Sequence, residues 1–292
     1  MGLPGRRSHA LDSVCKNRAM SGFGPLVSAD WLRDHLAAED LRVIDLRWYP
    51  DGRSGRDAYL AGHVPGAVFV DLERDITGTE GPGRHPIPSR EQFQEAMRAA
   101  GVEPESGVVV YDDLGGFSAA RLWWLLRYFG HPSVAVLDGG LMAWRGPLER
   151  EPPSLSRGSF WAAVPDLSMV VDRDHVKAAR RAVVIDARAP DRYRGEVEPF
   201  DPKAGHIPGA RNVPWRSNLG PDWRFLPPSE LRRKYATPKG REVIAYCGSG
   251  VSASVDLLAL ELAGIPGSKL YEGSWSDWSR QDLPVATGDR TP

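Results

Sequence analysis

A cysteine in a glycine-spaced loop is the residue best suited to chemistry in this chain. Residues 243–264 read VIAYCGSGVSASVDLLALELAG. The first four residues predict a buried strand and the last twelve an apolar helix closed by Gly264, so Cys247 is expected on a tight turn between them. There the backbone N–H groups of residues 248–251 can converge on one point, and the helix dipole favours a negative sulfur. The loop therefore predicts a nucleophilic thiolate. The alternative is a small apolar residue at the end of a strand.

Length and composition limit the class of protein that can carry this loop. The 292 residues suffice for about two domains, and 41% hydrophobic residues with ten tryptophans can fill substantial cores. The net charge of −1 argues against nucleic acid or an anionic membrane as a partner. No apolar run approaches the roughly 18 residues that span a bilayer, so a soluble protein is expected. With Cys15 and Cys247 as the only cysteines, a reducing, cytoplasmic setting is expected rather than a disulfide framework.

The first 21 residues have a composition of their own. They hold four basic residues and one acid, without a continuous apolar segment of the length that a secretory signal requires. We expect a disordered extension over residues 1–21, or a start-site artefact with Met20 as the natural beginning. A mitochondrial-type targeting segment is the weaker alternative.

The chain repeats itself. Residues 41–72 match residues 182–215, and residues 107–144 match residues 241–278. Strand-like runs alternate with amphipathic stretches in each copy, as in parallel α/β folds. The sequence therefore predicts two tandem domains at residues 22–148 and 166–288, each a parallel sheet flanked by helices, with residues 149–165 as the linker.

Several elements of the two copies are expected at equivalent places. Helices are predicted over 118–129 and 252–263, because each ends at a glycine with a proline two residues later. Strands are predicted at 43–44, 108–111 and 134–137 in the first copy, and at 183–185, 243–246 and 269–271 in the second. Ligands of parallel sheets bind outside the carboxyl ends of the strands, where Cys247 is expected.

The duplication provides an internal comparison at the loop. Tyr111 is followed by Asp112, whereas the equivalent Tyr246 is followed by Cys247. A carboxylate at a helix N-terminus can cap the helix but cannot attack sulfur. The second copy is therefore expected to catalyse, and the first to support the cleft.

Together these motifs resemble the tandem rhodanese-domain sulfurtransferases. The shared features are the duplicated module, a GH(V/I)PGA turn in each half, the (D/E)G(G/S)xxxW segments at 138–144 and 272–278, and the loop CGSGVS. The loop is more similar to the 3-mercaptopyruvate sulfurtransferase branch than to the thiosulfate branch. The resemblance implies five-stranded parallel sheets of the rhodanese-like fold and a persulfide mechanism without a metal or an organic cofactor.

The chemistry that the resemblance implies fits the loop residues. The Cys247 thiolate would take sulfur from a small-molecule donor, release pyruvate and rest as a persulfide, until thioredoxin, a low-molecular-weight thiol or cyanide accepts the sulfur. Backbone N–H groups of Gly248, Gly250 and Val251 would hold the anionic sulfur. The Ser249 hydroxyl would assist at the sulfur or at the departing enolate carbon. As an alternative, Ser249 is only a compact turn residue.

The charges near the loop bear on the choice of donor. Thiosulfate is a dianion that favours a cation inside the loop, which has none, whereas mercaptopyruvate needs a partner for its carboxylate outside the loop. Arg188, Arg192 and Arg194 follow the strand that ends at Asp186 and are the candidates; matching the family motif selects Arg192 for the carboxylate. As an alternative, these arginines form structural ion pairs.

The chain departs from the family pattern after the Glu198-Pro199 pair. Related sequences carry a second arginine there, whereas this chain has Phe200. Either Lys203 replaces that arginine, or the second contact is missing.

Asp57 and His63 match positions that approach the cleft in the mercaptopyruvate branch. A histidine beside a carboxylate could relay protons to Ser249. However, His206 occupies the same turn in the second copy, so a structural role is an equal alternative. Trp215 and Trp275 are the tryptophans expected to line the cleft.

Two other classes of protein and one other donor are the alternatives to this hypothesis. Cysteine phosphatases of related topology carry an arginine six residues after the cysteine, where this chain has Ala253. The intact cysteine loop argues against a non-catalytic binding module. Thiosulfate as the preferred donor is the remaining alternative.

Overall fold

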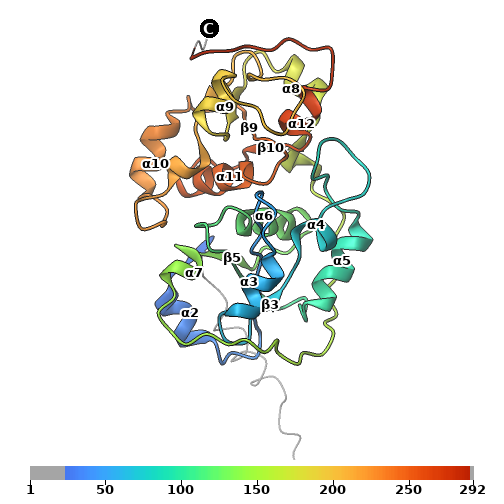
Figure 1. Ribbon diagram of the computed structural model, residues 1–292, viewed down its shortest axis with the longest axis vertical. Helices are drawn as coiled ribbons and strands as arrows, with labels where there is room; N and C mark the ends of the chain where they lie inside the picture. Colours follow the sequence, from blue (N-terminus) through green and yellow to red (C-terminus); the bar gives the residue numbers. More distant parts are fainter. Residues whose placement is uncertain (1–23, 290–292) are drawn as a thin grey trace, which may run out of the picture.

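The duplicated α/β organisation is confirmed. The computed structural model describes residues 24–289, so the extension expected at residues 1–21, Cys15 included, lies outside the described residues. Two five-stranded sheets form two units, one above the other in Figure 1, and all strand pairs are parallel. The first sheet uses strands from residues 26–137 and the second uses strands from residues 170–271.

The N-terminal unit has the strand order β1-β5-β4-β2-β3. Its strands are β1 (Leu26–Val27), β2 (Leu41–Asp45), β3 (Val68–Phe69), β4 (Gly107–Tyr111) and β5 (Val134–Leu137). Its helices are α2 (Ala29–His35), α3 (Gly55–Ala61), α4 (Leu72–Asp75), α5 (Arg90–Ala99), α6 (Ala119–Tyr128) and α7 (Gly140–Ala143).

The C-terminal unit repeats this arrangement, with the order β6-β10-β9-β7-β8. Its strands are β6 (Val170–Val171), β7 (Val183–Asp186), β8 (Arg211–Asn212), β9 (Val243–Tyr246) and β10 (Lys269–Tyr271). Its helices are η1 (Leu167–Met169), α8 (Arg173–Ala178), α9 (Pro190–Arg194), η2 (Trp215–Asn218), α10 (Pro228–Tyr235), α11 (Ala253–Leu262) and α12 (Ser274–Trp278).

Strand β9 holds the centre of the second sheet and fixes the position of the cysteine loop. All four of its residues are buried, as expected for an apolar strand covered on both faces. In the register of β7 and β9, Asp186 lies beside Tyr246, so both strands end at one edge. Cys247 therefore leaves the sheet at its carboxyl edge, as predicted.

Helices α6 and α11 face each other at the boundary of the two units (Figure 1). Nearly all residues of both helices are buried, because each packs on its own sheet and on the other helix. This explains why these sequences are apolar around most of the helix rather than on one stripe. One hydrophobic core runs through both units, so the loop before α11 is held against the N-terminal unit.

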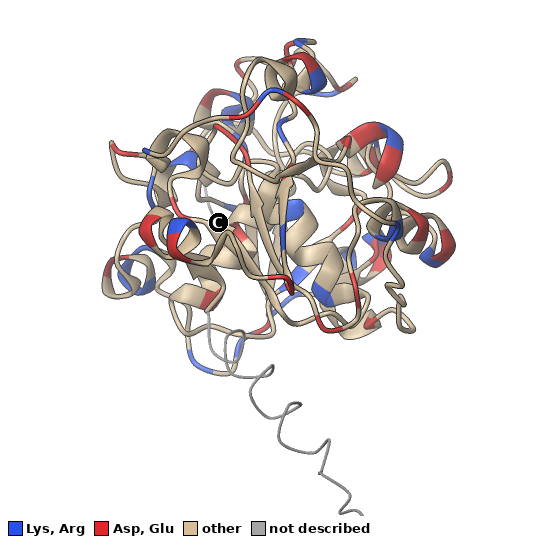
Figure 2. Cartoon of the chain, turned by 90° about the horizontal axis from the view of Figure 1, so that it is seen from below, with Lys and Arg blue, Asp and Glu red and all other residues tan. Residues whose placement is uncertain are grey.

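Charged residues are distributed over the outside of both units. In the view of Figure 2, basic and acidic positions are interspersed along the outer helices and loops, in keeping with 37 basic and 38 acidic residues. Among residues 24–289, no helix is long and apolar enough to cross a membrane.

Candidate active site

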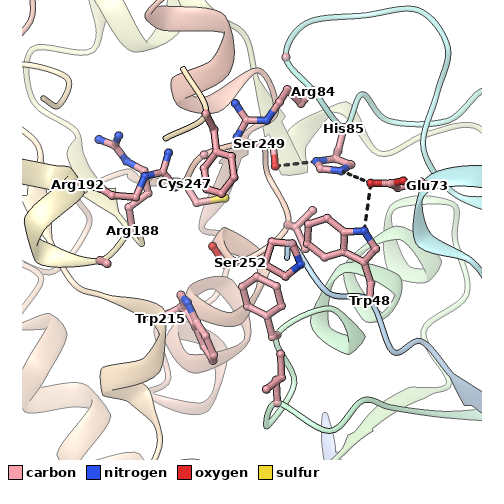
Figure 3. A pocket seen from close by; sticks show the side chains of 18 of the residues that line it. Trp48, Glu73, Arg84, His85, Arg188, Arg192, Trp215, Cys247, Ser249 and Ser252 are labelled. Atoms are coloured by element: carbon pink, nitrogen blue, oxygen red, sulfur yellow. Dashed lines mark hydrogen bonds and ion pairs between the residues drawn. The ribbon is translucent and has the colours of Figure 1, made fainter. Parts of the chain in front are cut away.

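Cys247 lies at a cavity between the two units (Figure 3). The cavity has a volume of about 750 Å³, and Cys247, Gly248 and Ser249 form part of its wall. The cysteine is only 2% exposed. Its backbone N–H donates to Ser274 Oγ at 3.2 Å, and Gly250 N–H donates to Sγ at 3.1 Å. The sulfur is thus fixed in place and faces a space large enough for a small donor.

The equivalent loop of the N-terminal unit shows how the backbone of such a turn binds an anion. Asp112 occupies the place of Cys247, and its carboxylate accepts four backbone N–H groups at 2.8–2.9 Å, from Leu114, Gly116, Ser118 and Ala119. In the C-terminal copy only Gly250 N–H reaches Sγ, and the N–H groups of Val251 and Ser252 have no acceptor among the described residues. These groups are available to a second atom attached to Sγ.

The two glycines of the loop are required for different reasons. Gly250 has φ +86°, a left-handed conformation that side chains disfavour. A Cβ on Gly248 would lie 3.0 Å from a terminal nitrogen of Arg84 and 3.3 Å from one of Arg192. Gly248 therefore allows two guanidinium groups to approach the backbone beside the sulfur.

Of the two arginines predicted to bind substrate, Arg192 has more free donors than Arg188. Its terminal Nη2 donates to Glu198 at 2.7 Å, whereas its buried Nε has no partner among the described residues. Arg188 binds Asp186 through two nitrogens and also contacts Glu198, and its side chain is 1% exposed. Arg188 borders the cavity but donates four of its five N–H groups to Asp186, Glu198 and Gly205, so its contacts favour the alternative of a structural ion pair. Its counterpart Arg47 pairs with Asp45 in the same way, which marks this ion pair as part of the fold.

The Ser249 hydroxyl contacts a histidine that the sequence analysis missed. Ser249 Oγ and His85 Nδ1 are 2.7 Å apart. His85 comes from the loop between α4 and α5 of the N-terminal unit, and its Nε2 lies 3.8 Å from Glu73, which accepts an N–H from Trp48 at 3.2 Å (Figure 3). The segment GPGRHPIP carries no periodicity, and its only signal is a histidine in a loop rich in glycine and proline.

His85 is neutral at pH 7. Burial lowers its pKa to about 4, with the Arg121 and Arg84 charges acting in the same direction. Because Nε2 faces the Glu73 carboxylate, we place the single ring proton on Nε2. Nδ1 is then an acceptor, so the Ser249 O–H donates to it.

His63 and Asp57 do not take part in this arrangement. His63 is buried, stacks on Tyr59 and bonds through Nδ1 to the Tyr59 carbonyl at 2.9 Å. His206 makes the same stack and the same bond with Tyr193. Asp57 is exposed in the first turn of α3. Neither His63 nor Asp57 borders the cavity, so the prediction that they approach Ser249 is wrong: the turn is a feature of the fold that both copies need.

Two further predictions have different outcomes. Trp215 borders the cavity as expected, together with Trp48, Phe117 and Trp223. Trp275 is fully buried, with its indole N–H donated to the Lys203 carbonyl at 2.9 Å, so it belongs to the core. Lys203 Nζ donates to the Gln281 carbonyl at 2.6 Å and does not border the cavity, so it does not replace the missing arginine.

Arg121 of α6 contacts the loop and is not among the residues that line the cavity. It is 2% exposed and donates to the carbonyls of Gly250 and His85 at 3.4 and 3.1 Å. Among the described residues no carboxylate forms an ion pair with it. Burial lowers its pKa to about 10, while the nearby Cys247 favours its charged form. An unpaired buried cation favours negative charge on the neighbouring sulfur.

We expect Arg121→Met to slow alkylation of Cys247 by iodoacetamide at pH 7 by roughly tenfold, because one nearby positive charge is lost. Removing an unpaired buried charge should leave the melting temperature the same or higher. Arg127→Met is the control, since Arg127 lies on the same helix but pairs with Glu261. Equal alkylation rates in Arg121→Met and Arg127→Met would contradict the electrostatic role.

Comparison with known proteins agrees with this architecture. The model of the rhodanese-like domain matches residues 28–146 and 172–281. The chain is 44% identical over 280 residues to a probable 3-mercaptopyruvate sulfurtransferase from Pseudomonas aeruginosa, covering 90% of this chain and 98% of that protein. It is also 41% identical to a putative thiosulfate sulfurtransferase, SseB, from Mycobacterium tuberculosis, covering 86% of this chain and 93% of that protein.

A solved structure shares the arrangement of both units. The crystal structure of SseA from Escherichia coli, described with the rhodanese fold and as a 3-mercaptopyruvate sulfotransferase, superposes with a TM-score of 0.78 at 38% identity. The match covers 87% of this chain and all of that one. The chain belongs to the tandem rhodanese-domain sulfurtransferases, in the 3-mercaptopyruvate branch that its loop resembles.

Proposed function

We propose that this enzyme transfers the sulfur of 3-mercaptopyruvate to Cys247 and from there to an acceptor thiol. The observation that carries the proposal is the position of Cys247, at a cavity whose lining includes Arg84, Arg192 and Arg280. Glu73 is the one carboxylate among the described lining residues, so the cavity favours an anion. Relatives named for this activity support the donor.

The geometry of the cavity supports the following first half-reaction. The thiolate attacks the donor sulfur, the carbon–sulfur bond breaks, and its electron pair passes to the enolate of pyruvate. The donor's thiol proton passes through Ser249, whose hydroxyl is bonded to neutral His85, to the enolate carbon. The products are pyruvate and the anion of Cys247-S-SH, whose outer sulfur the N–H groups of Val251 and Ser252 can bind.

The second half-reaction returns the sulfur to solution. A thiolate or cyanide attacks the outer sulfur of the persulfide, and the electron pair of the S–S bond returns to Cys247. A low-molecular-weight thiol, or a protein thiol such as that of thioredoxin, is the acceptor class that we propose, in a reducing cytoplasmic compartment. The cavity wall of Trp48, Phe117, Trp215 and Trp223 carries no formal charge and leaves room for an acceptor beside the donor site.

Thiosulfate is the second candidate donor. The loop itself has no cation, but Arg84 and Arg192 reach its Gly248 from outside, and a dianion could use both of them. A relative of similar identity is named for thiosulfate. The test is a parallel assay of sulfur transfer to cyanide from each donor. We expect a higher kcat/KM with mercaptopyruvate, and a preference for thiosulfate would overturn the donor assignment.

We expect Arg192→Met to raise the KM for mercaptopyruvate about tenfold with a smaller change in kcat, because a charge-assisted bond to the carboxylate is lost. Lys203→Met is the matched control, since its ammonium group binds a carbonyl away from the cavity. Steady-state kinetics with mercaptopyruvate and thiosulfate measure both variants. Equal losses of Arg192→Met with the two donors would contradict the carboxylate contact.

A further inference from the structure

A short segment of the N-terminal unit is inserted against the catalytic loop of the other unit. Gly83 approaches so closely that a Cβ would lie 2.6 Å from the Gly273 carbonyl oxygen. Arg84 N–H donates to Ser276 Oγ at 3.1 Å, and the next residue, His85, holds Ser249. The backbone of the segment is therefore fixed to the C-terminal unit, and the side chain of Arg84 starts from a defined point.

The Arg84 side chain converges with Arg192 on the same piece of backbone. Both guanidinium groups lie beside Gly248, within 3.0 and 3.3 Å of the place where its Cβ would be. Both also lie over the Phe200 ring, at 5.6 Å for Arg84 and 5.1 Å for Arg192. Figure 3 shows the two arginines approaching the cysteine from opposite units.

The acids that keep these two cations together lie behind them. Asp201 pairs with Arg84 and, at 3.5 Å, with Arg192, while Glu198 pairs with Arg192 at 2.7 Å. The side chains of Asp201 and Glu198 are 0% and 3% exposed, whereas those of Arg84 and Arg192 are 26% and 16% exposed. Neither acid borders the cavity, but both arginines do. The cluster thus presents guanidinium edges to the cavity.

The N–H groups of Arg84 and Arg192 that the two acids leave free suit a carboxylate. Arg84 uses Nη1 for Asp201, and no described residue accepts from its Nη2, the atom beside Gly248. Arg192 uses Nη2 for its acids, and its Nη1 likewise points at Gly248. Because free N–H groups of both arginines face the same backbone position, they can donate together to the oxygens of one carboxylate.

We propose that Arg84 is a second ligand of the donor's carboxylate, so that the anion site is shared between the two units. The proposal rests on the proposed function and names a residue for its donor site. It also explains how a chain with Phe200 after Glu198-Pro199 can bind the carboxylate: Arg84 supplies the second cation, and the Phe200 ring lies within cation–π distance of both Arg84 and Arg192.

The alternative role for Arg84 is that of an ion pair between the units and nothing more. The chain offers a matched control for this, because Arg127 forms another ion pair across the same boundary, with Glu261, and is 32% exposed. Arg127 does not border the cavity. Arg127→Met therefore removes an ion pair of the same kind without touching the donor site.

The test compares mercaptopyruvate with mercaptoacetone, which has the same thiol and ketone but no carboxylate. For Arg84→Met we expect the ratio of kcat/KM for the two donors to fall about tenfold, mainly through the KM for mercaptopyruvate. Arg127→Met should keep the ratio of the unaltered protein. Arg84→Lys keeps the charge but not the planar donor set, so its ratio should lie between those of Arg84→Met and Arg127→Met.

Two results would overturn the proposal. A ratio unchanged in Arg84→Met would show that the carboxylate does not contact Arg84, and equal losses with both donors would reduce Arg84 to a support for the loop. If turnover of Arg84→Met is too slow to measure, calorimetry of pyruvate binding to the folded variant takes its place. Weaker binding than in the unaltered protein supports the contact between Arg84 and the carboxylate, and equal binding contradicts it. Failure of the proposed function itself would appear differently, as an unaltered protein that takes no sulfur from mercaptopyruvate.

Discussion

Cys247→Ser is expected to reduce sulfur transfer from every donor below detection. A serine hydroxyl is not ionised at pH 7 and cannot form a persulfide, so neither half-reaction has a nucleophile. The loop should keep its shape, because the Ser274 and Gly250 contacts need only a small side chain at this place. The measurement is pyruvate release and thiocyanate formation, with a thermal melt to verify folding.

The chain contains its own control for this variant. Cys15, the other cysteine, lies in the N-terminal extension outside the described residues. Cys15→Ser should turn over like the unaltered protein. Residual transfer by Cys247→Ser that disappears in the double variant would place the sulfur on Cys15 and contradict the assignment.

The second large effect is expected at His85. Replacing it with alanine removes the acceptor for the Ser249 O–H, and we expect kcat for mercaptopyruvate to fall about a hundredfold, within the range for one general acid–base group. KM should change less, because the carboxylate contacts remain. His63→Gln is the control: it should lower the melting temperature through the lost contact with Tyr59 but keep kcat.

The pH dependence of kcat in the unaltered protein and in His85→Ala distinguishes a proton relay through His85 from a structural role. His85 has a pKa lowered to about 4, so it is neutral at pH 7 and becomes protonated only as the pH falls through that value. Protonated Nδ1 cannot accept from Ser249, so kcat of the unaltered protein should fall below roughly pH 5. His85→Ala should lack this acid limb. An unchanged acid limb in the variant would rule out the relay.

The parts of the site that sequence could predict are local in the chain. The strand before Cys247, the glycines after it and the helix that follows are consecutive residues, so composition and spacing describe them fully. Arg192 became a candidate because it follows the neighbouring strand at the same edge of the sheet, but only the family motif singled it out among the arginines there. The edge strands β1, β3, β6 and β8 have two residues each, too few for any periodicity to reveal them.

The residues of the site that sequence did not reveal depend on contacts between the two copies. His85 and Arg84 reach the loop from the other unit, through a segment whose glycines and prolines give no pattern. The prediction named His63 instead of His85, although His63 stands in a motif present in both copies. Here the motif has the same structural role in both copies: His63 and His206 each stack on a tyrosine and bond to its carbonyl.

The most direct test of the account is the intact mass of the protein after mercaptopyruvate alone, without an acceptor. We expect a gain of about 32 Da per chain, the mass of one sulfur atom, located on the peptide of Cys247 and matched by one equivalent of pyruvate. Addition of a small thiol should return the original mass. An unchanged mass, or sulfur on Cys15 instead, would contradict the claim that Cys247 carries the sulfur.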